Sequence, residues 1–463
     1  MNPTLSASVT IETQRTRRKL RSESCLPDDI ERSVRQLLAD KISGNMTGIW
    51  LLLPELLRLG AWDMLRGWGG CVGTDDLSAR LALHLVNEAA LGSLLRKRVT
   101  ISQKGFEVAN GLPFVPSDMA IHDLLEKHTM QDAKNLELTL GRIRRASGHY
   151  CGRVLAIDPH HMASYTKRQT RRHRKDTADR AKKTLQTVFV LDADAEVPVC
   201  YGLYSSSCPV SQTVPELLRM ATTILPANGP RLLVLADKEH FSIELYKEAD
   251  HLGVDLLVPL PNTVANQKLM QRLPDAAFSR HWPGYYTART LFRFQGGDRD
   301  YTLMIQREGE SPDQYTYEGF VCTSPRDELE TLAQQYPKRW HIEEFFNRDQ
   351  SIGWQRAGTL NLNIRGNRMA FALLAQAAVH QFRGKLPEQC RQYSCNTIAQ
   401  QYFNGLDGDV RVEGDTIVVT YYNAPNDKEW RRQYEDLPRQ LEAEGVSPTI
   451  PWLYGFKLDF RFN

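Results

Sequence analysis

Two acidic residues follow short apolar runs in the middle of the chain. Asp158 comes directly after the apolar residues 154–157, and Asp237 comes directly after the apolar residues 232–236. Short apolar runs bounded by polar residues are typical of buried strands, and sites in α/β sheets are built at strand ends. A single aspartate of this kind is more often a turn or cap residue. Two such aspartates followed by a third acid, Glu343, in a helical segment form a rarer arrangement, which indicates a functional site.

Three carboxylates at one edge of a sheet suit phosphoryl transfer. Reactions of this class use two divalent metal ions, roughly 3.5–4 Å apart, to activate the attacking oxygen and stabilise the leaving oxygen. Hard cations such as Mg²⁺ prefer carboxylate ligands. We therefore expect Asp158, Asp237 and Glu343 to be catalytic and to bind two Mg²⁺ ions, for which Mn²⁺ is expected to substitute.

Glu343 also belongs to a helical pattern with two other polar side chains. Tyr336, Arg339 and Glu343 are three and four residues apart, so they share one face of a helix. That face would present a phenol, a guanidinium suited to phosphate, and a metal-binding carboxylate. Taken alone, the spacing fits equally well an amphipathic helix with a surface ion pair between Arg339 and Glu343. Pro337 predicts either a cap at Tyr336 or a kink in this helix.

These motifs together resemble the insertion-sequence transposases of the Asp-Asp-Glu class, whose catalytic domain is RNase H-like. The family signature is Tyr, two residues, Arg, three residues, Glu, six residues, Lys. This sequence has Tyr336, Arg339 and Glu343 at that spacing, with both Asp blocks upstream in order, and has Gln350 in place of the Lys. The resemblance covers roughly residues 150–385.

The resemblance implies a DNA transposase that cleaves transposon ends in a metal-dependent reaction and transfers the freed strand into target DNA. The implied partners are double-stranded DNA and a second copy of the chain, as a homodimer on DNA. Two alternatives stay open. One is a domesticated, non-catalytic DNA-binding protein, which is compatible with Gln350 in place of the family Lys. The other is an RNase H-like nuclease without strand transfer. The terminal repeats, the target sequence, a hairpin intermediate and the recognition helix do not follow from the sequence.

Basic residues are concentrated in two runs although the net charge is only +3. One run lies within residues 15–21, and a denser one lies within residues 167–183. Beside a nuclease centre we favour contact between the second run and DNA over a merely solvated surface. The residues expected to bind DNA are Tyr336, Lys338, Arg339, Arg171, Arg172, Arg174 and Lys175. Arg348 and Lys338 are the candidates to replace the missing Lys.

The patterning along the chain predicts an α/β fold with a mixed sheet and flanking helices, which the resemblance makes RNase H-like. A β-rich insertion interrupts this sheet, and a helical domain precedes it. The expected parts are a basic flexible arm (1–24), a helical N-terminal DNA-binding domain (25–147), the first part of the catalytic domain (150–261), the β-rich insertion (262–323), the second part of the catalytic domain (324–385), and a C-terminal region that mediates dimerisation or contacts DNA (386–463).

Turn chemistry predicts several local features. Hairpins are expected to turn at Gly296-Gly297 and at Gly414-Asp415, and a helix is expected to begin at Ser324-Pro325. Trp282, Tyr285 and Tyr286 fit either stacking on an extruded base, as in hairpin-forming relatives, or the core of the insertion. We expect the core.

The eight cysteines are scattered through a long chain, which predicts free thiols in a reducing compartment. The N-terminal residues contain no apolar signal region. The most apolar stretch, residues 47–62, is interrupted by Pro54, Glu55 and Arg58 and is too short to span a bilayer. We therefore expect a cytoplasmic, nucleoid-associated protein without a membrane partner.

Overall fold

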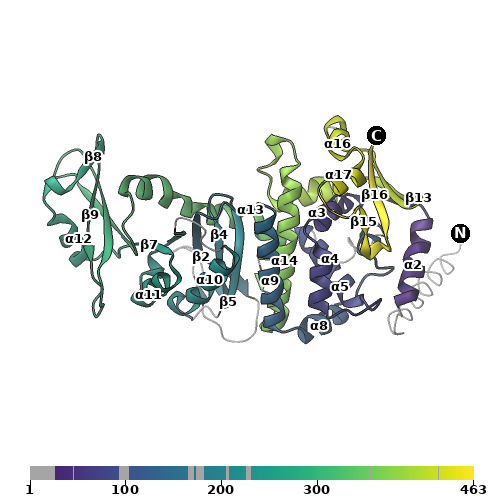
Figure 1. Cartoon of the computed structure of the whole chain (residues 1–463), viewed down its shortest axis with the longest axis horizontal. Coiled ribbons are helices and arrows are strands. Elements are labelled where there is room, and N and C mark those ends of the chain that lie inside the picture. The colour runs from purple at the N-terminus through teal and green to yellow at the C-terminus, as the bar shows by residue number, and fades with distance from the viewer. Residues whose placement is uncertain are drawn as a thin grey trace. The chain divides into compact units, whose positions relative to one another are not determined.

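The computed structural model describes residues 27–44, 46–92, 104–164, 172–173, 182–204, 208–225, 231–354, 356–357, 359–425 and 427–463. The chain divides into two compact units. The first comprises Met1–Leu136, Ser351–Gly353 and Asn363–Asn463, and the second comprises Glu137–Gln350 and Trp354–Leu362. Figure 1 labels their helices and strands.

The second unit is built on a mixed sheet. Its first strands are β2 (Val154–Ser164), β4 (Lys182–Asp192), β5 (Val197–Tyr204), β6 (Leu233–Ala236) and β7 (Asp255–Pro259). β4 runs antiparallel to both β2 and β5, whereas β6 is parallel to β2 and β7 is parallel to β6. Three successive antiparallel strands followed by parallel strands confirm the predicted mixed α/β sheet.

Two helices supply the crossovers that the parallel strands need. α10 (Val210–Ile224) connects β5 to β6, and α11 (Ile243–Leu252) connects β6 to β7. Both bury apolar side chains in one core with the strands. α11 begins where Ser242 Oγ accepts a hydrogen bond from the backbone N–H of Leu245 at 3.4 Å. It ends at Gly253, whose φ of 67° is a left-handed conformation that favours glycine.

The β-rich segment continues the same sheet. Its strands are β8 (Ser279–Trp282), β9 (Tyr285–Phe292), β10 (Tyr301–Glu308) and β11 (Thr316–Cys322), with β11 antiparallel to β7. β9 and β10 form an antiparallel hairpin around Gly296-Gly297, as predicted. The segment opens with a helix that the sequence reading missed, α12 (Val264–Gln271). Thr263 Oγ1 caps it by accepting from the backbone N–H of Asn266 at 3.2 Å.

The helical region after β11 begins later than predicted, at residue 328. Ser324 does not cap it, because its hydroxyl donates to Asp255 Oδ1 at 2.6 Å. Asp327 is the cap, since its Oδ1 accepts from the backbone N–H of Glu330 at 2.7 Å. The prediction of a start at Ser324-Pro325 was therefore wrong.

This helical region changes geometry around Pro337. A π-helical turn, η5 (Glu330–Gln335), is followed by a 3₁₀ turn, η6 (Tyr336–Trp340), and then by α13 (His341–Asp349). Proline has no N–H to donate and its ring clashes with the preceding turn, so the regular α-helical ladder is interrupted. The irregular geometry agrees with the predicted perturbation at this position.

The first unit combines helices with a small five-stranded sheet. Its described α-helices are α2 (Pro27–Ala39), α3 (Leu53–Arg58), α4 (Ala61–Gly69), α5 (Leu77–Ala90), α7 (Lys104–Ala109), α8 (Asp118–Lys127), α15 (Cys395–Ile398), α16 (Asp427–Tyr434) and α17 (Leu437–Ala443), together with parts of α9 (Met130–Ala146) and α14 (Leu362–Gly384). Its strands follow the order β1-β13-β14-β16-β15, in which β16 is Phe456–Phe462 and β15 is Thr449–Ile450.

The small sheet joins segments that are distant in the sequence. β13 (Gly408–Glu413) and β14 (Thr416–Tyr421) form the predicted hairpin around Gly414-Asp415. β1 (Ile42–Gly44) pairs with β13, although the sequence indicated no strand in this region. Three residues carry too little periodicity to be recognised as a strand, because the partner that satisfies their backbone groups lies more than 360 residues further on.

The cysteines of the described residues are all free thiols, as predicted. Among the helices that the structure describes, none is both long enough and apolar enough to cross a bilayer.

Candidate active site

Asp158 lies inside a strand, not at its end. β2 continues six residues further, because residues 155–163 pair with β4. The parallel pairing of β2 with β6, however, stops at Ile157 and Ala236. The prediction of a strand end was therefore wrong for β2 itself, but Asp158 does stand where the parallel part of the sheet ends.

Asp237 follows the last residue of β6 and caps the short helix η3 (Lys238–His240). Its Oδ1 accepts from the backbone N–H of Glu239 at 3.0 Å and lies 2.7 Å from His240 Nδ1. Burial alone would raise the pKa of Asp237, but the hydrogen bond and charge of His240 and the N–H of Glu239 lower it overall. The structure therefore favours an ionised Asp237 even without a bound cation.

His240 is a further residue of this site that was not among the predicted ones. Its side chain is fully buried beneath Asp237. The sequence signal is its position three residues after a strand-terminal aspartate, a spacing at which a turn brings two side chains together. The ring nitrogen Nδ1 holds one carboxylate oxygen of Asp237 in place, so we assign His240 a positioning role.

The two aspartates lie side by side at one sheet edge, because each follows a residue of the pair Ile157 and Ala236. Burial, followed by the negative charge of Asp237, raises the pKa of Asp158 to about 8, and Arg339 opposes this effect. Neighbouring carboxylates in a partly desolvated place repel each other unless a cation lies between them. This edge therefore has the electrostatic character of a cation site.

Arg339 links the sheet edge to the third acid. Its Nη2 donates to Glu343 Oε1 at 3.1 Å, and its Nη1 lies 3.9 Å from Asp158 Oδ1. The ion pair between Arg339 and Glu343 that the spacing predicted is therefore present, but it is not fully solvated, because the Arg339 side chain is only 12% exposed. α13 thus brings Glu343 toward Asp158 through a shared guanidinium.

Tyr336 lies on the same side of the helical region. Its ring packs edge-on against Phe320 of β11, with centroids 4.7 Å apart. Burial raises the pKa of Tyr336 to about 12, while the charge of Arg339 and a hydrogen bond with it act in the opposite direction. The phenol therefore stays protonated through the whole neutral range.

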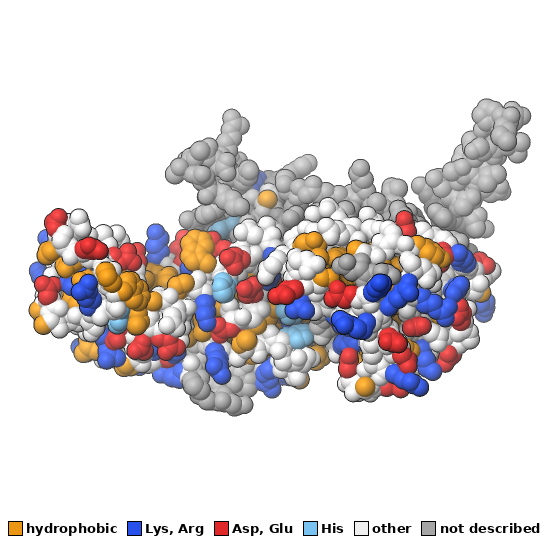
Figure 2. Space-filling model, turned by 90° about the horizontal axis from the view of Figure 1, so that it is seen from above, with side chains coloured by type: hydrophobic (Ala, Val, Ile, Leu, Met, Phe, Trp, Pro, Cys, Tyr) orange, Lys and Arg blue, Asp and Glu red, His pale blue; other side chains and the backbone are white. Residues whose placement is uncertain are grey.

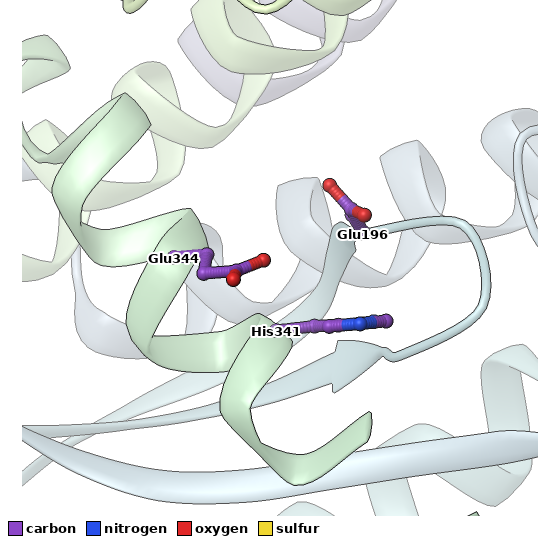
Figure 3. Close-up of side chains that lie close together, drawn as sticks. All are labelled: Glu196, His341 and Glu344. Carbon is purple, nitrogen blue, oxygen red and sulfur yellow. The ribbon is translucent and has the colours of Figure 1, made fainter. Parts of the chain in front are cut away.

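The three predicted acids do not form the tightest potential ligand set in the described part of the chain. That set is Glu196, His341 and Glu344, whose ligand atoms all lie within 4.8 Å of one another (Figure 3). Glu343 instead points its carboxylate to Arg339. This cluster does not follow from the sequence, because Glu196 belongs to a turn far upstream of His341 and Glu344.

The two candidates for the missing family Lys are both engaged elsewhere. Lys338 Nζ donates to Asp194 at 2.5 Å, and Arg348 Nη1 donates to Glu196 at 2.7 Å. Both partners lie in or next to the turn between β4 and β5. Neither cation is directed at Glu343 in this structure.

Most of the other predicted DNA contacts cannot be placed. Arg171, Arg174 and Lys175 lie outside the described residues, and Arg172 is described only by its backbone pairing in β3 (Arg172–His173) with β4. On the face that Figure 2 shows, acidic and basic side chains of the described residues lie interspersed. The expected role of this basic run therefore remains a prediction.

A pocket of about 660 Å³ borders Tyr336 and is lined by Trp340 of η6 and by Trp282 and Tyr285 of the β-rich segment. Tyr285 is buried, as expected for a core residue, but Trp282 is 46% exposed. The core expectation was wrong for Trp282, because its ring stacks on the outside of Tyr285 at a centroid distance of 4.3 Å.

Comparison with known proteins is consistent with this geometry. Residues 149–377, which contain all three predicted acids, match the family described as the transposase DDE domain. The match supports a DDE-type transposase, the class indicated by the acids at the edge of the mixed sheet. No curated protein matches the chain.

Among solved structures, the chain is similar to one described as the cryo-EM structure of piggyBac transposase synaptic complex with hairpin DNA. The TM-score is 0.39 at 10% sequence identity, and the similarity covers 79% of this chain and 82% of that chain.

Proposed function

We propose that this protein is a DNA transposase that cleaves the ends of a mobile element and joins the freed 3′-hydroxyl to target DNA. The catalytic residues are Asp158, Asp237 and Glu343. The observation that carries the proposal is the position of Arg339 between Asp158 and Glu343, within a segment that matches the transposase DDE domain. β2, which carries Asp158, and the continuous η6 and α13, which carry Arg339 and Glu343, come from separate parts of that segment and meet at this point.

We also propose that the catalytic domain is RNase H-like and that the β-rich segment is an insertion into it. The support is the sheet itself, in which three antiparallel strands are followed by parallel strands with intervening helices. The segment from α12 to β11 enters after β7 and returns to pair with β7. Because the chain returns to the sheet at β11, the helix α13 that follows can pack against β2, the strand that carries Asp158.

The three acids fit divalent metal ions. Their donors are hard oxygens, and the pKa of Asp158 is raised by its burial and by the neighbouring charge of Asp237, both of which a bound cation would offset. Asp158, Asp237 and Glu343 would hold two Mg²⁺ ions, or Mn²⁺ in their place, which supply activation of the attacking oxygen and stabilisation of the leaving oxygen. To bind a metal ion, Glu343 would give up the hydrogen bond that it accepts from Arg339.

The remaining residues bind and orient the DNA backbone. Arg339, once released from Glu343, presents a planar fork that matches a phosphate. Tyr336 remains a protonated donor beside it. Arg171, Arg172, Arg174, Lys175 and Lys338 neutralise further phosphates, which makes affinity fall with salt. A homodimer on DNA would engage the two ends of one element.

The test is cleavage and strand transfer with DNA that carries the ends of the element, in Mg²⁺. Asp158→Asn, Asp237→Asn and Glu343→Gln are expected to bind this DNA and to leave it uncut. Asp298→Asn, an exposed acid of the same unit, is the matched control and is expected to cut normally. Activity of Glu343→Gln at the wild-type rate would refute the assignment of the third carboxylate.

One observation favours a second candidate function. Gln350 replaces the family Lys, and both nearby cations are held in ion pairs. A domesticated DNA-binding protein without cleavage activity would tolerate this loss. Wild-type protein that binds the element's ends but cuts them in neither Mg²⁺ nor Mn²⁺ would establish that function. Cleavage without joining would instead identify a nuclease.

A further inference from the structure

A second group of metal-ligating side chains lies beside the first turn of α13 and does not include Glu343, whose carboxylate is bonded to Arg339. His341 and Glu344 occupy the first turn of this helix, and Glu196 comes from the turn between β4 and β5 (Figure 3). Residues two apart on a helix point about 200° away from each other. His341 therefore faces away from Glu343, and this cluster is separate from the three catalytic carboxylates.

The imidazole of His341 is held as a metal-binding histidine would be. Its Nδ1 lies 2.6 Å from the backbone oxygen of Ala193, so Nδ1 carries the proton and donates it. In the neutral ring, Nε2 then has a free lone pair. A backbone carbonyl that accepts from the other ring nitrogen is the usual partner that fixes the orientation of a metal-ligating histidine.

Both glutamates retain oxygens for a ligand. Arg348 donates to Oε2 of Glu196 at 2.7 Å and to its backbone oxygen at 2.9 Å, which orients the side chain and leaves Oε1. Glu344 is exposed at the mouth of the cluster. The three residues together offer one imidazole nitrogen, from His341, and carboxylate oxygens from Glu196 and Glu344. Three protein ligands leave coordination positions open for water.

The cluster is preformed. The turn between β4 and β5 is fastened to η6 and α13 by three contacts: Lys338 with Asp194, His341 with Ala193, and Arg348 with Glu196. Little ordering is therefore left for a cation to impose, which favours binding. Glu344 takes part in none of these contacts, so Glu344→Gln leaves all three in place.

We propose that Glu196, His341 and Glu344 form a binding site for a divalent transition-metal ion of the Zn²⁺ type. Imidazole together with carboxylate suits such ions better than Mg²⁺, which prefers oxygen alone. An ion here would clamp the turn between β4 and β5 to the helix that carries Glu343. The site goes beyond the proposed function, since it neither contacts the catalytic carboxylates nor requires cleavage.

The experiment measures Zn²⁺ bound to the full-length chain by equilibrium dialysis and elemental analysis, in excess Mg²⁺. It uses the Asp158→Asn/Asp237→Asn/Glu343→Gln background, so that the proposed catalytic site does not contribute. Adding Glu344→Gln or His341→Ala is expected to remove one Zn²⁺ per chain. The loss of affinity should exceed the roughly 10- to 100-fold cost of removing only a partner of a metal ligand.

Matched controls are His251→Ala and Glu244→Gln, two exposed residues of α11. They are expected to retain the full Zn²⁺ content of the background. Thermal unfolding without metal serves to establish that each variant is folded, and Glu344→Gln keeps both side-chain volume and exposure. Unchanged Zn²⁺ content and affinity in Glu344→Gln, His341→Ala and Glu196→Gln alike would overturn the proposal. This result is independent of DNA cleavage, so failure of one proposal is distinguishable from failure of the other.

Discussion

Arg339 donates a 3.1 Å hydrogen bond to Glu343 while its other terminal nitrogen lies 3.9 Å from Asp158. One guanidinium thus neutralises part of the charge of two acids that come from a helix and a strand. A phosphate or a cation that enters this edge must compete with these pairs. Several expectations depend on this arrangement.

Replacing Arg339 is expected to slow strand cleavage. Arg339→Ala removes both the neutralising charge and the proposed phosphate donor, and loss of one such donor typically costs about 10²- to 10³-fold in rate. Arg339→Lys should recover only part of this loss, because an ammonium cannot bind two oxygens in a planar fork. Single-turnover nicking measures the effect, with the exposed Arg293→Ala as control. Equal rates for Arg339→Ala and wild type would contradict the role.

The contribution of Asp158 to the stability of the metal-free protein is expected to decrease as pH rises from about 4 to about 8. The pKa of Asp158 is about 8 in the folded state and near 3.8 when unfolded, so the folded chain binds more protons within this interval. The contribution of Asp158 to the free energy of unfolding is therefore fully present below the pKa of the unfolded chain and is lost as pH approaches 8. The lowered pKa of Asp237 has the opposite sign but acts only at lower pH.

Thermal unfolding in a chelator across this pH interval tests the expectation. Asp158→Asn should remove the part of the slope that depends on this group. Asp298→Asn, which lies exposed, should leave it intact. A wild-type slope that Asp158→Asn does not alter would show that this carboxyl titrates normally.

His240 is expected to act through Asp237. His240→Leu removes the nitrogen that lies 2.7 Å from Oδ1, so the pKa of Asp237 should rise and cleavage should fall about 10- to 100-fold, as for other partners of metal ligands. His240→Asn places an amide near the position of Nδ1 and should restore part of the activity. The acid limb of the pH–rate profile is the diagnostic measurement. A lower rate with an unmoved acid limb would indicate mere structural damage.

Restoring the family Lys is expected to strengthen DNA binding. Gln350→Lys adds a cation seven residues, or about two helical turns, beyond Glu343. One more phosphate contact there would increase the slope of log K against log salt by about 0.9. Binding isotherms at several salt concentrations measure this slope. Gln271→Lys adds the same charge in the exposed end of α12 and is the control. Identical slopes for the two variants would mean that position 350 does not face DNA.

α13 is expected to depend on aromatic packing for its position. Phe345 is fully buried, and its ring lies 5.8 Å from Phe189 of β4 and 5.2 Å from Trp354. Phe345→Ala should lower the free energy of unfolding by about 3–5 kcal/mol, through lost contacts and a cavity. Denaturant titration measures the change. Phe345→Leu, which keeps most of the volume, should cost less; an equal cost would argue against packing as the cause.

The sequence alone was sufficient to propose the three acids and to place two of them after buried apolar runs and the third in a helical segment. Apolar runs before Asp158 and Asp237 record burial within a sheet, and the spacing from Tyr336 to Glu343 records one helical face. Both signals are local, because strand and helix periods act over a few residues. The mixed sheet and both hairpins followed from the same kind of information.

Tertiary structure decided what depends on partners far along the chain. β2 runs past Asp158 because β4 pairs with it, and β1 exists because β13 satisfies its backbone. The link from Arg339 to Asp158, and the meeting of Glu196 with His341, likewise join elements with no common local pattern. Such contacts arise from how elements pack in three dimensions, which the spacing of residues along one element does not encode.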